Sequence, residues 1–211
     1  MNETLKRAIF GAVYVAIMWL GASYSETSCR FLFSVLGIVS VYEMWKLRKG
    51  RSKFIAYLYV LLPFSLIQLL ISDFQVDNVP FNSSLILSMF VFTWTFDTFA
   101  YLFGVKFGRH KIMPSISPKK SWEGFVGGYF ATLFICFLFC KFLPITEDYL
   151  LVLSLIIPFT ATLGDFIESY FKRQAGVKDS GNFIPGHGGM LDRMDAFMIT
   201  IPVIYILTNL L

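Results

Sequence analysis

Seven long apolar runs divide the 211-residue chain, and they constrain its fold more than any other feature. Only 15% of the residues are charged, against about 25% in soluble domains. Each run approaches the length of about 20 helical residues that crosses a hydrocarbon core of about 30 Å, although the first two are short. Lipid offers no partner for unpaired backbone groups, so such spans fold as helices. The sequence predicts an all-α fold, a polytopic integral membrane helical bundle with about seven transmembrane helices, at approximately residues 8–24, 31–45, 54–71, 85–105, 125–143, 149–167 and 190–211.

The basic residues predict the orientation of this bundle, because Lys and Arg are retained on the cytoplasmic side of a membrane. If seven spans alternate, all but Arg30 and Lys141 of the 18 lysines and arginines fall on one side. The N-terminus and the basic loops are then cytoplasmic, and the C-terminus lies outside. Lys6 and Arg7 before a short apolar run resemble a signal peptide, but further spans follow, so we interpret the run as a retained anchor. The net charge of +4 reflects basic loops that favour an anionic lipid surface, and it gives no argument for nucleic acid.

The chain shows no repeat or linker, so we expect residues 1–211 to form a single membrane-embedded domain. Residues before about position 84 carry no pattern from which a reaction can be argued. From Thr93 on, polar residues enter the spans, and residues 93–200 are expected to carry the catalytic half. Two loops in this half, at about residues 104–123 and 172–189, are long and rich in Gly, Pro and Lys, which is typical of binding loops.

The end of the sixth span places Asp165, Glu168, Ser169 and Lys172 on one face of a helix, at i, i+3, i+4 and i+7. One carboxylate at the centre of a membrane helix costs about 2.5 to 3.5 kcal/mol, so intramembrane acids are candidates for function. The alternative is that Glu168 and Lys172 only pair at the membrane edge. That pair leaves Asp165, one turn deeper, without a partner.

Asp192 and Asp195 lie three residues apart at the start of the last span, with Arg193 between them. Two like charges in a low-dielectric site repel unless a cation or protons intervene, and Mg²⁺ needs only one or two carboxylates beside substrate phosphates. The alternative is that these aspartates stabilise a helix N-terminus. Together with Asp165, the pair favours a metal site. The glycine-rich segment around His187 would then supply backbone N–H groups to phosphate oxygens.

The other cytoplasmic loop places Ser117, Lys119 and Lys120 directly before the fifth span. Paired lysines at a membrane edge are often only topology determinants. Asp97, inside the fourth span, is expected to face the same cavity as these lysines. Gly124 and Gly128 are spaced for close helix packing. The sequence has no Walker A or His-Glu-x-x-His motif, which argues against a P-loop ATPase and a zincin.

Read together, these residues resemble the signature of the phosphatidate cytidylyltransferases, or CDP-diacylglycerol synthases. The signature comprises Ser169-x-Phe171-Lys172-Arg173, Lys178-Asp179-x-Gly181 and Ile184-Pro185-x-His187-Gly188-Gly189-Met190-x-Asp192-Arg193-Met194-Asp195. The resemblance extends upstream, over about half of the chain, through Asp97-Thr98-x-Ala100-Tyr101, Gly104, Gly108-Arg109, residues 117–124 and Gly164-Asp165. The first half departs from the family, whose members typically have more hydrophobic spans before this region.

The resemblance implies transfer of a cytidylyl group from CTP to phosphatidic acid, which gives CDP-diacylglycerol and pyrophosphate in phospholipid biosynthesis. It implies a required divalent cation, Mg²⁺, and leaves a second cation open. It also implies a homodimer and a multi-pass protein of the cytoplasmic (inner) membrane, with the active-site loops cytoplasmic.

The same resemblance assigns roles to residues of this chain. The metal would be bound by Asp165, Asp192 and Asp195, with Asp195 as a ligand or an orienting partner. These carboxylates and the basic pair Lys172 and Arg173 are the expected catalytic residues. The expected substrate-binding residues are Ser117, Lys119, Lys120, Ser169, Lys178, His187, Arg193 and Asp97.

Other functions stay open at this point. A CTP-dependent enzyme of another lipid, such as a CDP-archaeol synthase or a polyprenol kinase, would use similar residues. An anion transporter or an inactive membrane scaffold is the alternative from another class. The intact Asp165, Asp192 and Asp195 argue against a scaffold, and the one-sided charge argues against a transport path.

Overall fold

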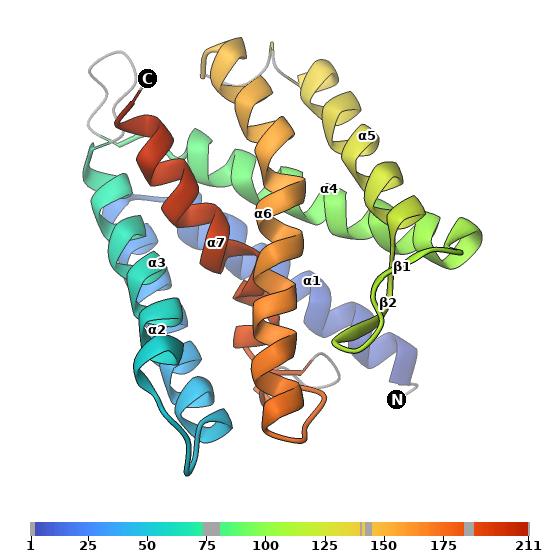
Figure 1. Cartoon of the computed structure of the whole chain (residues 1–211). Coiled ribbons are helices and arrows are strands. Elements are labelled where there is room, and N and C mark those ends of the chain that lie inside the picture. Colours follow the sequence, from blue (N-terminus) through green and yellow to red (C-terminus); the bar gives the residue numbers. More distant parts are fainter. Residues whose placement is uncertain (1–2, 74–80, 140, 142–144, 184–187, 211) are drawn as a thin grey trace.

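The computed structural model describes residues 3–73, 81–139, 141, 145–183 and 188–210, and these residues form seven helices and one two-stranded sheet (Figure 1). The helices are α1 (Glu3–Ser23), α2 (Glu26–Leu47), α3 (Phe54–Asp73), α4 (Ser84–Phe107), α5 (Trp122–Phe139), α6 (Glu147–Gln174) and α7 (Leu191–Thr208). The strands, β1 (Lys111–Met113) and β2 (Ser117–Ser121), form a hairpin between α4 and α5.

The helices bear out the predicted class of fold. Five of them, α2 to α6, are long and apolar enough to cross a membrane. In α1 the apolar part is the shorter stretch Ala8–Ser23, and α7 begins with the charged residues Asp192, Arg193 and Asp195. The prediction of an all-α polytopic membrane bundle is confirmed, with a helix at each predicted run. The number of spans and the cytoplasmic N-terminus stay predictions.

The basic segments after α2, after α4 and at the end of α6 are in contact with one another. Figure 1 shows the α2–α3 turn and the α6–α7 connection at the same end, with the C-terminus at the other. The Arg48 guanidinium, just after α2, lies 5.4 Å from the ring centroid of Phe171 and donates to Gln174 at the end of α6. Arg173 donates from Nε to the carbonyl of Ile116 in the hairpin, at 3.3 Å. These contacts tie the three loops together.

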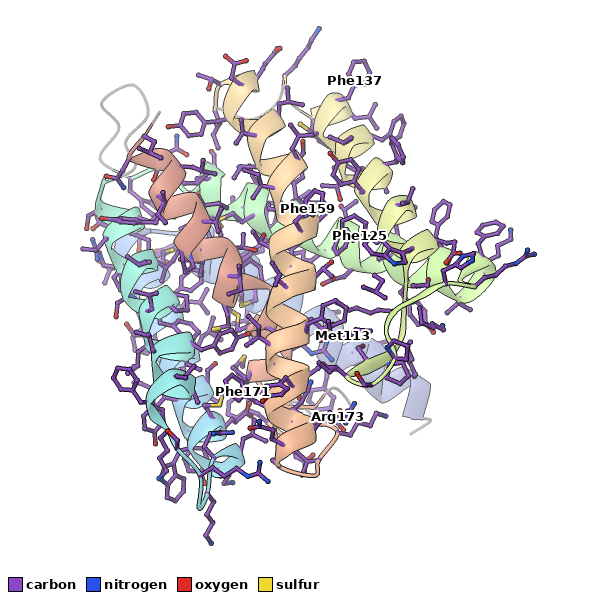
Figure 2. All side chains as sticks on the ribbon, viewed as in Figure 1. Met113, Phe125, Phe137, Phe159, Phe171 and Arg173 are labelled. Carbon is purple, nitrogen blue, oxygen red and sulfur yellow. The ribbon has the colours of Figure 1, made fainter. Side chains whose placement is uncertain are left out.

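Aromatic side chains fill the bundle and also cover its outside. The buried Phe90 of α4 has its ring centroid 6.2 Å from that of Phe33 in α2 and 5.4 Å from that of Phe197 in α7. Figure 2 shows Phe125 of α5 facing Phe159 of α6, with the two centroids 5.2 Å apart. Phe137 of α5 is 76% exposed, as expected of a side chain that contacts lipid.

Glycines allow the helices to approach closely beside the hairpin and in the α6–α7 contact. A Cβ at Gly124 would lie 2.6 Å from the carbonyl oxygen of Ala100, and one at Gly128 would lie 2.8 Å from a carbonyl oxygen of α4. The predicted packing role of this pair is confirmed. A Cβ at Gly164 of α6 would lie 2.1 Å from the carbonyl oxygen of Asp195, so the backbone of α7 rests directly on α6 at that point.

We expect Gly164→Ala to destabilise the protein by about 1–3 kcal/mol, because the added methyl group would push α7 away from α6. Thermal unfolding in detergent measures this loss. Gly104→Ala is the matched control, since its Cβ would meet Ser121 Oγ at 3.4 Å, an ordinary contact. Equal stability of the two variants would contradict the close contact of α6 and α7.

Candidate active site

The β1–β2 hairpin gives the basic loop an ordered shape. Its strands are antiparallel, with Lys111 opposite Ser121 and Met113 opposite Ser117. The carboxylate of Glu123, in the first turn of α5, accepts hydrogen bonds from backbone N–H groups at the base of the hairpin, those of residues 109 (3.1 Å) and 110 (3.2 Å). The hairpin is thereby fixed to the start of α5 and carries its lysines toward α6.

Asp165 joins the hairpin to α6. Lys120 Nζ lies 2.5 Å from Asp165 Oδ2, and the ammonium group lies 5.3 Å from the ring centroid of Phe166. On the other side, Ser169 Oγ donates to Asp165 Oδ1 at 3.0 Å. Within the polar face of α6, the described partner of Asp165 is Ser169. The opposite charge comes from Lys120 in the hairpin. The structure brings together Lys120, Asp165 and Ser169 of the predicted site residues.

Three carboxylates form a cluster between α6 and α7. Asp165, Glu168 and Asp195 each offer one oxygen, and these oxygens lie within 4.8 Å of one another. The cluster depends on the contact at Gly164, which brings the backbone of Asp195 onto α6. Of the predicted metal-binding residues, the cluster includes Asp165 and Asp195. Its third member is Glu168, which was predicted to share the polar face of Asp165 but was not predicted to bind the metal.

These residues fit a hard divalent cation. Glu168 is fully buried, and apart from its ion pair with Lys172 its oxygens accept no hydrogen bond within the described part of the chain. Lys172 is shared with Asp192, so the cluster is only partly neutralised by its lysines. Oxygen ligands with an excess of negative charge are what Mg²⁺ prefers, and a cation would relieve the repulsion between them.

Asp192 lies beside the cluster with both oxygens occupied by donors. Lys172 Nζ donates to Oδ1 at 2.7 Å. Oδ2 accepts from the backbone N–H groups of Ser180 (2.9 Å) and Gly189 (2.7 Å) and lies 3.1 Å from Ser180 Oγ. The Gly189 N–H group, which was expected to face a phosphate, is thus bonded to Asp192. The role of Asp192 as a metal ligand stays a prediction.

A cavity of about 650 Å³ connects these groups. One part of its wall is polar and one is apolar, and the apolar part comes from α4, α5 and the hairpin. The predicted site residues that line it are Asp97, Ser117, Lys119, Lys120, Asp165, Asp192 and Asp195. The apolar part includes Phe96, Ala100, Tyr101, Val105, Ile112 and Phe125.

The other predicted residues lie around this cavity. Arg173 is exposed and donates to the carbonyls of Ile116 and Val177, so it fastens the hairpin tip to the end of α6. Lys178 is exposed on the next loop. Arg193 lines a neighbouring cavity of about 390 Å³, which shares Asp97, Asp192 and Asp195 with the first. His187 lies outside the described residues.

Sequence reasoning overlooked Glu43 and undervalued Glu168. Glu43 of α2 is buried and accepts hydrogen bonds from the loop before α7, although the first half of the chain was expected to carry no such chemistry. The available signal was an acid inside an apolar run, where a charge is costly. For Glu168 the signal was its position on the same helical face as Asp165.

The fold and the site define a class: a polytopic membrane protein with a cavity in which carboxylates suited to a cation face lysines suited to an anion. Within this class, the chain belongs to the cytidylyltransferase family, whose model matches residues 2–211. The predicted family is confirmed.

Curated relatives carry a more specific name. A phosphatidate cytidylyltransferase of Staphylococcus aureus (strain COL) is 48% identical over 124 residues, which are 58% of this chain and 48% of the relative. Proteins of the same name from Staphylococcus saprophyticus and Staphylococcus haemolyticus are 47% and 45% identical over the same shares. The match spans about half the length of these relatives.

Proposed function

We propose that this chain transfers the cytidylyl group of CTP to the phosphate of phosphatidic acid and releases pyrophosphate. The observation that carries the proposal is the ion pair of Lys120 with Asp165, which brings an anion-binding hairpin to a carboxylate cluster suited to Mg²⁺. The names of the relatives support the choice of substrates.

Both substrates are anions, so the first task of the site is to bring two phosphates together against their repulsion. Lys119 and Lys120 of the hairpin would neutralise phosphate oxygens at the polar part of the cavity, with Ser117 as a hydrogen-bond donor. Aligning the lipid phosphate with the α-phosphorus of CTP supplies most of the catalysis that such a transfer needs.

Asp165, Glu168 and Asp195 would hold the cation. The cation would polarise phosphoryl oxygens and neutralise part of the negative charge that develops during the transfer. Lys172 bridges Glu168 and Asp192 and so fixes the α7 side of the site in place. A second cation and the predicted homodimer have no support in this chain and stay predictions.

The lipid would approach from the bilayer. Helices α4 and α5 and the hairpin form the apolar part of the cavity, so acyl chains can lie against Phe96, Val105 and Phe125 while the phosphate meets the lysines. The protein is a multi-pass membrane protein, and we place it in the cytoplasmic (inner) membrane with the three basic loops in the cytoplasm, where CTP is available.

The purified protein should convert labelled CTP, phosphatidic acid and Mg²⁺ to labelled CDP-diacylglycerol and pyrophosphate. Omission of phosphatidic acid and omission of Mg²⁺ are the controls. Product only with an ether lipid would favour the CDP-archaeol reaction, and phosphorylation of a polyprenol would favour the kinase. Phospholipid flux without product would indicate a transporter.

Single cysteines at opposite ends of the bundle test the orientation. In a background without Cys29, Cys136 and Cys140, we expect Asn182→Cys to react with a membrane-impermeant maleimide only from the cytoplasmic face. Thr146→Cys, just before α6, should react only from the outer face. Both positions are exposed. Labelling of both from one face would contradict the orientation.

A further inference from the structure

Glu43 is a buried carboxylate in the last turns of α2, and all of its described hydrogen-bond partners lie in the loop before α7 or at the start of α7. Its side chain is 4% exposed and forms no ion pair with any of the residues that the structure describes. Its oxygens accept hydrogen bonds from the N–H groups of Met190 (3.0 Å) and Leu191 (2.8 Å), where α7 begins, and from Ser180 Oγ (2.8 Å). Neutral donors therefore satisfy a charge that would otherwise be costly to bury.

The loop is shaped to receive this carboxylate. A Cβ at Gly181 would lie 2.5 Å from Glu43 Oε1. A Cβ at Gly189 would lie 2.4 Å from Glu43 Oε2 and 2.1 Å from Ser180 Oγ. A side chain at either position would force the Glu43 carboxylate or the Ser180 hydroxyl to shift, so the backbone on both sides of the loop approaches Glu43 closely.

The same loop residues hold Asp192. Ser180 contacts both carboxylates, because its hydroxyl lies 2.8 Å from Glu43 Oε2 and 3.1 Å from Asp192 Oδ2. The N–H groups of Ser180 and Gly189 donate to Asp192 as well. Asp192 in turn binds Lys172, which pairs with Glu168 of the cluster. A continuous path of polar contacts runs from α2 to the candidate metal cluster.

We propose that Glu43 is a positioning residue of the active site, which anchors residues 180–181 and 189–191, at the two described ends of the connection between α6 and α7, to α2 and thereby fixes Asp192 and Lys172. Glu43 does not line the cavity, so it acts through these residues and not on a substrate. For its effect on turnover the inference rests on the proposed function. The anchoring of the loop can be measured without it.

Protection of a buried cysteine measures the anchoring. Met190 is 6% exposed, so Met190→Cys in the background without other cysteines should react slowly with N-ethylmaleimide. We expect Glu43→Gln to raise this rate severalfold. The carboxylate accepts from three donors with two oxygens, whereas the amide has one acceptor oxygen, so the loop is held less firmly. Ser40→Ala is the matched control: Ser40 is also buried on α2 but forms no hydrogen bond with the described residues, so the rate should not change.

Kinetics separate positioning from a loss of folded protein. Per folded molecule, Glu43→Gln should lower kcat by about 10- to 100-fold, as supporting residues of metal sites do. The KM values for CTP and phosphatidic acid should stay within about twofold, because Glu43 touches neither substrate. Ser180→Ala should lower kcat less, and its effect should shrink in the Glu43→Gln background, because the two residues share one path.

The possible outcomes are distinct. A folded Glu43→Gln protein with slow labelling and unchanged kcat would overturn the proposal. If Glu43→Gln does not fold, Ser180→Ala decides, since it leaves the backbone bonds to Glu43 intact, and an unchanged kcat would then overturn it. If the wild-type protein has no transferase activity, the proposed function fails, and the labelling of Met190→Cys alone decides whether Glu43 anchors the loop.

Discussion

Asp165→Asn is expected to remove nearly all transferase activity while the protein still inserts and purifies normally. The amide keeps the shape of the side chain and its contact with Ser169, but it removes a charge from the cluster with Glu168 and Asp195. A loss of at least about 100-fold in kcat follows if Asp165 helps to hold the cation, because such ions stabilise transition states by several kcal/mol. The assay is CDP-diacylglycerol formation over a range of Mg²⁺ concentrations.

Asp148→Asn is the matched control, because Asp148 is an exposed carboxylate at the opposite end of the same helix. It should have wild-type activity. Stabilisation of the protein by Mg²⁺ in thermal unfolding provides a second measurement, and it should be lost in Asp165→Asn alone. Near-normal turnover with an unchanged Mg²⁺ requirement would remove Asp165 from the metal site.

Activity measured over a range of Mg²⁺ concentrations also decides the role of Asp192. If Asp192 binds the metal, Asp192→Asn should raise the Mg²⁺ concentration that gives half-maximal activity. If it only fixes Lys172 and the loop through the bonds seen here, kcat should fall at an unchanged Mg²⁺ requirement. The structure makes the second outcome a real alternative, because donors from Lys172, Ser180 and Gly189 already occupy both carboxylate oxygens of Asp192.

The helices and most of the site could be predicted because their signals are local. Seven apolar runs predict seven helices, and the stripe from Asp165 to Lys172 follows from helical spacing alone. The resemblance also assigned Lys119 and Lys120 to substrate binding. The structure places Lys120 in an ion pair with Asp165 of α6, a contact that was not predicted.

What could not be predicted depends on which helices touch. Spacing places Asp192 and Asp195 on one helical face, but it does not reveal that the contact at Gly164 brings Asp195 into the carboxylate cluster while Asp192 pairs with Lys172. Asp192 lies about one turn closer to the loop, and the backbone N–H groups of Ser180 and Gly189 donate hydrogen bonds to it. Glu43 lies more than a hundred residues from the loop it binds, so no local pattern could connect them.

Lys120→Ala is expected to lower kcat/KM sharply. The loss of transition-state stabilisation should be about 1.5 to 3 kcal/mol, the value of one charge-assisted hydrogen bond. The structure gives Lys120 two tasks, as a cation on the wall of the cavity and as the partner of Asp165. Lys106→Ala is the matched control: it removes the same charge beside the hairpin, from a lysine that packs on Phe107 and does not line the cavity. Steady-state kinetics with CTP and phosphatidic acid compare the two variants.

A double-mutant cycle shows whether Lys120 acts through Asp165. If the ion pair positions both groups, Lys120→Ala should cost much less in the Asp165→Asn background than in the wild type, since contacting residues are not additive. If Lys120 acts only on phosphates, the two losses should add. Full activity of Lys120→Ala with normal insertion would reduce this lysine to a topology determinant, and it would leave the anion site to the residues of α6, α7 and the loop between them.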